Sequence, residues 1–276
     1  MPAEDMVVLF SGGTDSTLAA ALAAESGRKI HLVTYDRFGL YSTGNTRRAA
    51  QGLSEKFGAD KVTHTVLRYD GLFRHASYER YLSNLTRHGF FVLSTCGLCK
   101  LAMHIRTIVY CLDHGFKNVC DGANKGMDLF PAQMDCVIDE LKKLYARFGI
   151  AYTNPVFDYE PPAEDGFLEK DNLALIKPAQ EEPRADGEKT AGRRLRELGL
   201  APADNIKGTA YDRERQPRCF QFILFNVFAK KYYLASHSLE EYREATLGFF
   251  RDKISRYAAL LLEYRESGAH KDILKS

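Results

Sequence analysis

The sequence predicts an α/β fold with a parallel, doubly wound sheet of the five-stranded type, followed by a loop-rich segment and a helical C-terminal region. Three observations support this prediction. Short apolar runs alternate with helix-length amphipathic patterns over the first 155 residues. Glycines follow several of the helical patterns where the next strand is expected. Seven of the nine prolines fall between residues 155 and 217, where the alternation ends.

The predicted strands are short, apolar and bounded by turn-forming residues, and they lie at 7–10, 30–35, 62–67, 118–120 and 150–154. The predicted helices between them follow periodic apolar patterns, and they lie at 16–24, 46–57, 100–114 and 132–148. Gly58, Gly115 and Gly149 close three of these helices. Because ligands of parallel sheets bind beyond the carboxyl ends of the strands, we expect the functional site at that edge.

The chain divides into three predicted regions. Residues 1–155 form the α/β domain. Residues 156–217 form a loop-rich connector with one short helix near 190–198. Residues 218–276 form a helical region whose aromatic side chains are spaced for packing in a core rather than for stacking on bases.

The composition is that of a globular protein, with 45% hydrophobic and 27% charged residues among 276. No apolar stretch approaches the roughly 20 residues that span a bilayer, and the N-terminus does not resemble a signal peptide, so we expect a cytoplasmic protein. The net charge of +2 does not predict nucleic-acid binding. Residues 190–276 nevertheless hold 16 basic and 11 acidic side chains, which suits either a solvated surface or a face for tRNA or an anionic nucleotide.

The first chemical motif is Ser-Gly-Gly-Thr-Asp-Ser, which follows an apolar strand and opens an alanine-rich helix. Glycines let the backbone approach a phosphate, and the first turn of a helix presents free N–H groups to an anion. The motif is neither a Walker A loop nor the glycine-rich loop of dinucleotide-binding folds. The candidate ATP-binding residues are Ser11, Gly12, Gly13, Thr14, Asp15 and Ser16.

Further candidates follow the other predicted strands. Asp36 ends the second strand, where it could contact adenine or ribose or simply end the strand. Gly122 and Asn124 follow the fourth strand and are candidate ATP-binding residues. A carboxylate beside phosphates is best explained by a bound cation, so Asp15 and Asp128 are candidate Mg²⁺ ligands.

The second chemical motif is the Cys96-Gly97-Leu98-Cys99-Lys100 segment at a helix start. Two thiols with this spacing can hold a metal or a cluster, and the helix dipole is expected to lower their pKa. A pair alone does not complete a metal site, and Cys219 is the best remote third ligand. The remaining cysteines are predicted to be core residues, namely Cys111, Cys120 and Cys136.

Ser-Gly-Gly-x-Asp-Ser, Cys-x-x-Cys-Lys and Asp-Gly-x-Asn in this order resemble the motifs of the N-type ATP pyrophosphatases, or PP-loop proteins. Within this superfamily the likeness is to the ATP-dependent sulfurtransferases, which include the nickel-pincer cofactor sulfurtransferases and the tRNA thiolases. The resemblance spans roughly residues 6–220 and implies an adenine nucleotide alpha hydrolase-like fold. The segment 160–190 and the surroundings of Cys219 depart from the family pattern.

The resemblance implies an enzyme that adenylates an acceptor with ATP and Mg²⁺, releases pyrophosphate and then transfers sulfur. Its implied catalytic residues are Asp15, Cys96, Lys100 and Cys219. The implied sulfur carrier is a [4Fe–4S] cluster on Cys96, Cys99 and Cys219, or a persulfide with Cys99 as the resolving thiol. The acceptor would be a nucleotide-like small molecule or a tRNA, and a homo-oligomer is possible. Two alternatives are a zinc-containing ligase that forms amides or nitriles, like 7-cyano-7-deazaguanine synthase, and a non-catalytic nucleotide sensor.

Overall fold

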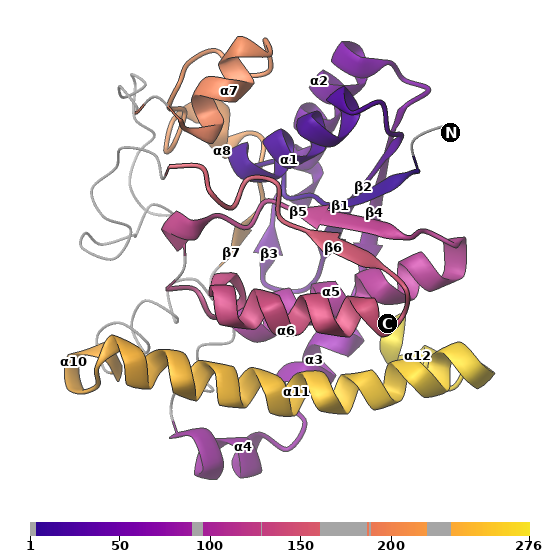
Figure 1. Cartoon of the computed structure of the whole chain (residues 1–276), viewed down its shortest axis with the longest axis vertical. Helices are drawn as coiled ribbons and strands as arrows, with labels where there is room; N and C mark the ends of the chain where they lie inside the picture. The colour runs from indigo at the N-terminus through magenta and orange to yellow at the C-terminus, as the bar shows by residue number, and fades with distance from the viewer. Residues whose placement is uncertain (1–3, 90–95, 128, 161–186, 188, 220–232) are drawn as a thin grey trace.

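The computed structural model describes residues 4–89, 96–127, 129–160, 187, 189–219 and 233–276. Its centre is a parallel five-stranded sheet with the strand order β4-β2-β1-β5-β6 (Figure 1). The strands are β1 (Met6–Leu9), β2 (Ile30–Asp36), β4 (Val62–Arg68), β5 (Asn118–Asp121) and β6 (Ala151–Thr153). The predicted α/β fold with a doubly wound parallel sheet is therefore confirmed.

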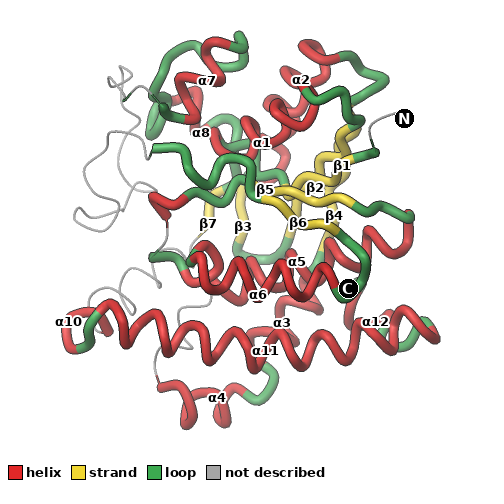
Figure 2. Tube along the Cα trace, viewed as in Figure 1, coloured by secondary structure: helices red, strands yellow, loops and turns green. Residues whose placement is uncertain are grey.

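Helices cover both faces of the sheet (Figure 2). One face carries α1 (Thr14–Glu25), α2 (Thr46–Phe57) and α7 (Ala191–Glu197), and the other carries α5 (Cys96–His114) and α6 (Asp135–Ala146). The long helix α11 (Leu239–Ser267) packs on α5 and α6 as a further layer. The remaining helices are α3 (Asp70–Tyr78), α4 (Tyr81–His88), α8 (Ala210–Arg213), α10 (Leu234–Ser236) and α12 (Lys271–Leu274).

The central strand β1 is buried on both faces, which explains why its sequence is a continuous apolar run. Val7 and Leu9 point into the core shared with α5, α6 and α11. Met6, Val8 and Phe10 point into the opposite core, under α1, α2 and α7. The two cores lie on the two sides of one sheet. Residues of the predicted connector pack into the core under α7, and residues of the helical region pack into the core under α11.

Several elements differ from the sequence-based expectation. The predicted helix 132–148 is wrong at its start, because a single 3₁₀ turn (Pro131–Gln133) comes first and Met134 is extended before α6 begins at Asp135. The sequence analysis did not indicate α4, an eight-residue helix that buries none of its residues and leaves Leu82 75% exposed. A small antiparallel sheet joins β3 (Leu40–Tyr41) to β7 (Arg218–Cys219), two strands too short to leave a pattern.

The helix α11 starts at a capping box, in which the Ser238 hydroxyl accepts from the Glu241 N–H and the Glu241 carboxylate accepts from the Ser238 N–H. It ends at Gly268, whose φ of 72° suits a residue without a side chain.

The predicted division into three regions stays a prediction. Among the described residues, no helix is both long and apolar enough to span a membrane.

The packing of α11 leads to the first prediction. Leu261 is fully buried in the core that α11 shares with the sheet, whereas Leu239 on the same helix is 51% exposed. Replacing Leu261 by alanine removes buried methyl groups and should lower the free energy of unfolding by about 2–5 kcal/mol in the main transition. Leu239→Ala should change it by less than about 0.5 kcal/mol. Denaturant unfolding of both variants checks this, and a main transition untouched by Leu261→Ala would mean that α11 unfolds separately.

Candidate active site

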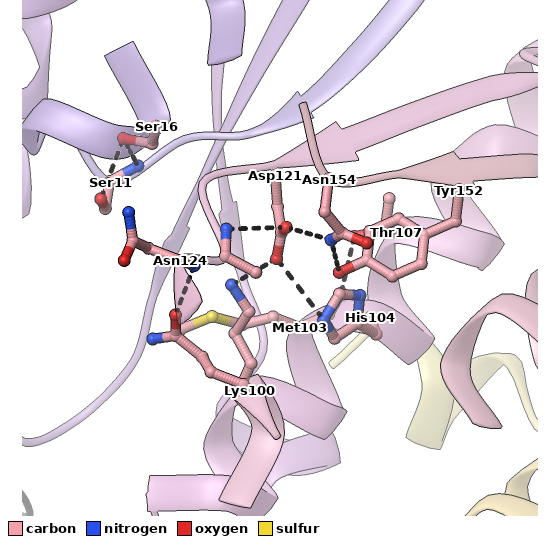
Figure 3. A network of polar contacts seen from close by, with 12 residues as sticks. Ser11, Ser16, Lys100, Met103, His104, Thr107, Asp121, Asn124, Tyr152 and Asn154 are labelled. Atoms are coloured by element: carbon pink, nitrogen blue, oxygen red, sulfur yellow. Dashed lines mark hydrogen bonds and ion pairs between the residues drawn. The ribbon is translucent and has the colours of Figure 1, made fainter. Parts of the chain in front are cut away.

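The loop between β1 and α1 is held in shape by its own serines. Ser16 Oγ donates to the Gly13 carbonyl at 3.1 Å and accepts from the Ser11 N–H at 3.2 Å. The hydroxyls of Ser11 and Ser16 are 3.0 Å apart (Figure 3). These contacts place the first N–H groups of α1 at the carboxyl edge of the sheet, where they can bind an anion.

Two glycines make the loop possible. Gly12 has a φ of +72°, and a side chain there would put Cβ 2.2 Å from the carbonyl oxygen of Arg215. A Cβ on Gly122 would lie 2.4 Å from the backbone nitrogen of Ser16. The end of β5 therefore presses directly against the start of α1. A side chain at position 122 would displace the helix terminus that the anion needs.

A cavity of about 330 Å³ opens at this edge. It lies where the strand order reverses between β1 and β5, the point at which ligands bind in doubly wound sheets. Predicted residues that line it are Ser11, Gly13, Thr14, Asp15, Ser16, Lys100 and Gly122. Residues that sequence reasoning missed also line it, among them Thr34, Lys207 and Gln216.

Lys100 is held at the cavity by Asp121. Its Nζ lies 2.7 Å from Oδ2 of Asp121, which is fully buried at the end of β5 (Figure 3). Asn154 Nδ2 and the Ala123 N–H donate to Oδ1 of the same carboxylate at 2.8 and 3.0 Å. Burial alone would raise the pKa of Asp121, but Lys100, His104 and these hydrogen bonds outweigh it and lower the pKa to about 2. Asp121 thus stays ionised and fixes the Lys100 ammonium.

His104 completes this buried group and is neutral. Burial, together with the charge of Lys100, lowers its pKa to about 3. Its Nδ1 is hydrogen-bonded to the Tyr145 hydroxyl at 3.1 Å. Its Nε2 lies 4.0 Å from Asp121, at the limit of an ion pair, and makes no hydrogen bond within the described part of the chain. We therefore treat the contact as one between a neutral ring and a carboxylate already neutralised by Lys100.

Cys99 and Cys219 meet at a residue that the sequence did not single out. Arg37, which follows β2 and is 2% exposed, donates from Nε to Cys99 Sγ at 3.2 Å and from Nη2 to Cys219 Sγ at 3.6 Å. The Tyr69 hydroxyl is hydrogen-bonded to Cys99 Sγ at 3.0 Å. The Arg37 guanidinium also lies over the Phe73 ring, 4.0 Å from its centroid. We call Arg37, Tyr69, Cys99 and Cys219 the thiol cluster.

The expected effect of the helix start on the Cys99 pKa is wrong. Burial raises the pKa of the Cys99 thiol, and the charge of Arg37 lowers it by less than burial raises it. Burial also tends to lower the pKa of Arg37, but Cys99 and Tyr69 outweigh burial and raise it, so the guanidinium stays charged.

The predicted core placement of Cys111 and Cys120 is confirmed, because both are 1% exposed, while Cys136 is half-buried.

Other predicted site residues are engaged within the fold. Asp36 Oδ1 accepts from the Thr43 hydroxyl at 2.8 Å. The Asn124 amide donates to the Tyr159 carbonyl at 3.3 Å and accepts from the Gly126 N–H at 2.7 Å. Their roles in ATP binding stay predictions.

Two predicted ligands cannot be placed. Asp128 and the Cys96 side chain lie outside the described residues. Within the described residues, no three His, Cys, Asp or Glu side chains are grouped as a metal site would require. The Mg²⁺ and cluster ligand sets therefore stay predictions.

A family model matches the N-terminal part of the chain. The model described as "Queuosine biosynthesis protein QueC" matches residues 5–78, from β1 through the Ser11–Ser16 loop to α3. The match covers about a quarter of the chain, and over these residues the chain is similar to that family. We call the Ser11–Ser16 segment the PP-loop, after the motif that it resembles. No curated protein matches the chain.

Solved structures resemble the chain distantly. A predicted subunit of tRNA methyltransferase from Methanocaldococcus jannaschii is 19% identical, with 79% of this chain and 97% of that chain covered and a TM-score of 0.38. NMN synthetase from Francisella tularensis is 13% identical, with 93% and 87% covered and a TM-score of 0.40. The U34-tRNA thiolase NcsA from Methanococcus maripaludis, with its [4Fe–4S] cluster, is 11% identical, with 91% and 72% covered and a TM-score of 0.40. At this distance they say nothing of the reaction.

The neutral state of His104 leads to a prediction on pH. In the unfolded chain His104 is protonated below its ordinary pKa of 6.5. In the folded protein it is protonated only below about pH 3. Stability from this group is therefore full above pH 6.5 and is lost as the pH falls towards 3, by at most about 1.4 kcal/mol per pH unit. His104→Gln should flatten the fall in unfolding free energy between pH 7 and 5, whereas the exposed His114→Gln control should not. Equal slopes in the two variants would contradict the assignment.

Proposed function

We propose that this protein is a PP-loop enzyme that adenylates an acceptor with ATP, releases pyrophosphate and then transfers sulfur to the activated acceptor. The observation that carries the proposal is the closeness of the thiol cluster to the nucleotide cavity. Cys99 and Lys100 are consecutive on α5, and one contacts Arg37 while the other lines the cavity. Cys219 pairs in register with Leu40, which also lines the cavity. Sulfur chemistry and nucleotide chemistry would thus share one edge of the sheet.

In the first step, the N–H groups at the start of α1 and the PP-loop hydroxyls hold the phosphates of ATP. Asp15 lines the cavity in the first turn of α1, where its carboxylate would need Mg²⁺ between it and the phosphates. An oxygen of the acceptor attacks the α-phosphorus, the bond to the β-phosphate oxygen breaks and pyrophosphate leaves. Lys100, fixed by Asp121, supplies positive charge where negative charge develops.

In the second step, the thiol cluster delivers sulfur. Sulfur displaces AMP from the acceptor, so that the acceptor–sulfur bond forms as the acceptor–oxygen bond breaks. The cationic Arg37 donates to both sulfurs, and its charge lowers the pKa of Cys99, although burial raises that pKa by more. In the persulfide route the outer sulfur on Cys96 or Cys219 attacks, Cys99 resolves the mixed disulfide, and an external thiol reductant reopens the disulfide that remains.

The thiol cluster also suits an iron–sulfur cluster as the sulfur carrier, and we propose a [4Fe–4S] cluster on Cys96, Cys99 and Cys219. Two of these thiols already share a guanidinium, whose charge complements that of a thiolate-bound cluster. Cys96 precedes Cys99 by three positions in the sequence, a spacing that suits two ligands of one metal or cluster. A bound cluster would supply sulfide for transfer.

A second candidate is an ATP-dependent ligase that forms an amide or a nitrile and holds zinc. The match of residues 5–78 to the QueC family model favours this candidate. The adenylation step is the same in both candidates. They differ in the metal at the cysteines and in whether nitrogen or sulfur displaces AMP.

Adenylation can be tested through Lys100. With a panel of nucleotide-like acceptors and tRNA, the wild-type enzyme should convert ATP to AMP and pyrophosphate. Lys100→Met should slow pyrophosphate release roughly 100-fold, because a charge aimed at the transition state is lost. Lys125→Met is the matched control, since Lys125 is exposed and does not line the cavity. A protein that only senses nucleotide would release no pyrophosphate with any acceptor, and this result would refute the proposal.

The thiol cluster can be tested by anaerobic purification with metal and acid-labile sulfide analysis. We expect iron and sulfide in near-equal amounts in the wild type. Cys219→Ala and Cys99→Ala should each lose most of the iron, while the control Cys136→Ala, on a different helix, should keep it. Stoichiometric zinc without sulfide would support the ligase instead. Iron content unchanged in Cys219→Ala would rule out this cysteine as a ligand.

A further inference from the structure

A second polar site lies far from the PP-loop in sequence, between α4 and α11. A cavity of about 360 Å³ separates these helices, and its lining holds four cationic side chains and one carboxylate. The cations are Arg80, Arg87, Lys253 and Arg256. We call this cavity the basic groove. Figure 1 shows α4 as the outermost helix below α11, so the groove lies on the outer side of the α11 layer.

The carboxylates near the groove are already engaged. Asp252 pairs with Arg87 at 2.7 Å. Glu79 pairs with Arg256 and also with His75, whose Nε2 is 2.9 Å away. No ion pair to Arg80 is found within the described part of the chain, and its side chain is exposed. The basic groove therefore holds more positive charge than its own carboxylates neutralise.

Lys253 is buried beside these charges. The residue is 5% exposed, and its ammonium donates to the Ala76 carbonyl at 2.8 Å. Burial lowers its pKa to about 8, and the charges of Arg256 and Arg80 act in the same direction although Glu79 and Asp252 oppose them. Cations that repel one another in this way are stabilised when an anion binds between them.

The uncharged part of the lining indicates which anion fits. Ser83, Asn84 and Ser255 add hydroxyl and amide donors between the cations. Arginine, lysine, serine and asparagine are the side chains that contact phosphate and sugar oxygens of nucleic acids. Phe249 is the one apolar side chain among the lining residues, so the groove offers little to a lipid tail or to an apolar peptide anchor.

We propose that the basic groove binds the sugar–phosphate backbone of an RNA. This inference adds a partner to the proposed function, and it concerns a surface rather than the reacting atoms. The chain itself links the two places, because α4 ends at His88 and only residues 89–95 separate it from Cys96 at the start of α5.

The test is binding of a fluorescein-labelled RNA hairpin, followed by anisotropy over a salt series without ATP. The variant Arg80→Glu/Arg87→Gln removes two cations and should weaken binding by at least about 10-fold. The slope of log affinity against log salt concentration should become smaller by about one for each phosphate that the groove no longer neutralises. Ser83→Glu adds a negative charge to the groove without breaking an ion pair and should also weaken binding. Lys271→Glu, which changes an exposed lysine on α12, should bind as the wild type does.

Unchanged affinity in both groove variants would overturn the proposal, and so would equal weakening in Lys271→Glu. Preferential binding of inorganic pyrophosphate or of an acidic peptide, with no binding of the hairpin, would also overturn it. Thermal unfolding of each variant shows whether it is folded. Because binding is measured without ATP, a failure here leaves the adenylation and sulfur-transfer tests unaffected, and their failure would leave RNA binding standing.

Discussion

The buried carboxylate of Asp121 is the interaction on which the active site depends. It lies at the end of β5, beside the end of β1, and is satisfied by a lysine, an amide and a backbone N–H. Leaving such a charge without partners in a core would cost several kcal/mol, so its surroundings are strongly constrained. The need to pair this carboxylate fixes the positions of two side chains, Lys100 from α5 and Asn154 from the segment after β6. The next residue, Gly122, touches the start of α1, so the same turn also positions the PP-loop.

The strand, loop and helix start that make up the PP-loop segment could be predicted because they are local features. Strand, glycine turn and helix start are consecutive, and each has a sequence signal of its own. Lys100 stands out beside the cysteines, but its partner Asp121 could be recognised only as a residue that ends a strand. The pairing depends on β5 lying next to β1, and that adjacency is a property of the sheet order rather than of either segment.

The thiol cluster could be predicted only in part. Cys99 and Cys219 are candidates on sequence grounds, yet nothing in the sequence marks Arg37 or Tyr69, which follow two different strands and are ordinary residues in their local patterns. A guanidinium that joins sulfurs from α5 and β7 exists only once the small β3–β7 sheet has formed. The predicted pKa of Cys99 is wrong for a related reason. A helix terminus is a local feature, whereas the burial that raises this pKa is imposed by tertiary packing.

The neighbouring positions of Cys99 and Lys100 have a mechanical consequence. Both belong to the first two turns of α5, a 19-residue helix packed into the core, so a shift of this end of the helix would move both residues together. A ligand in the cavity that shifted this end of α5 would therefore also change the contact between Cys99 Sγ and Arg37.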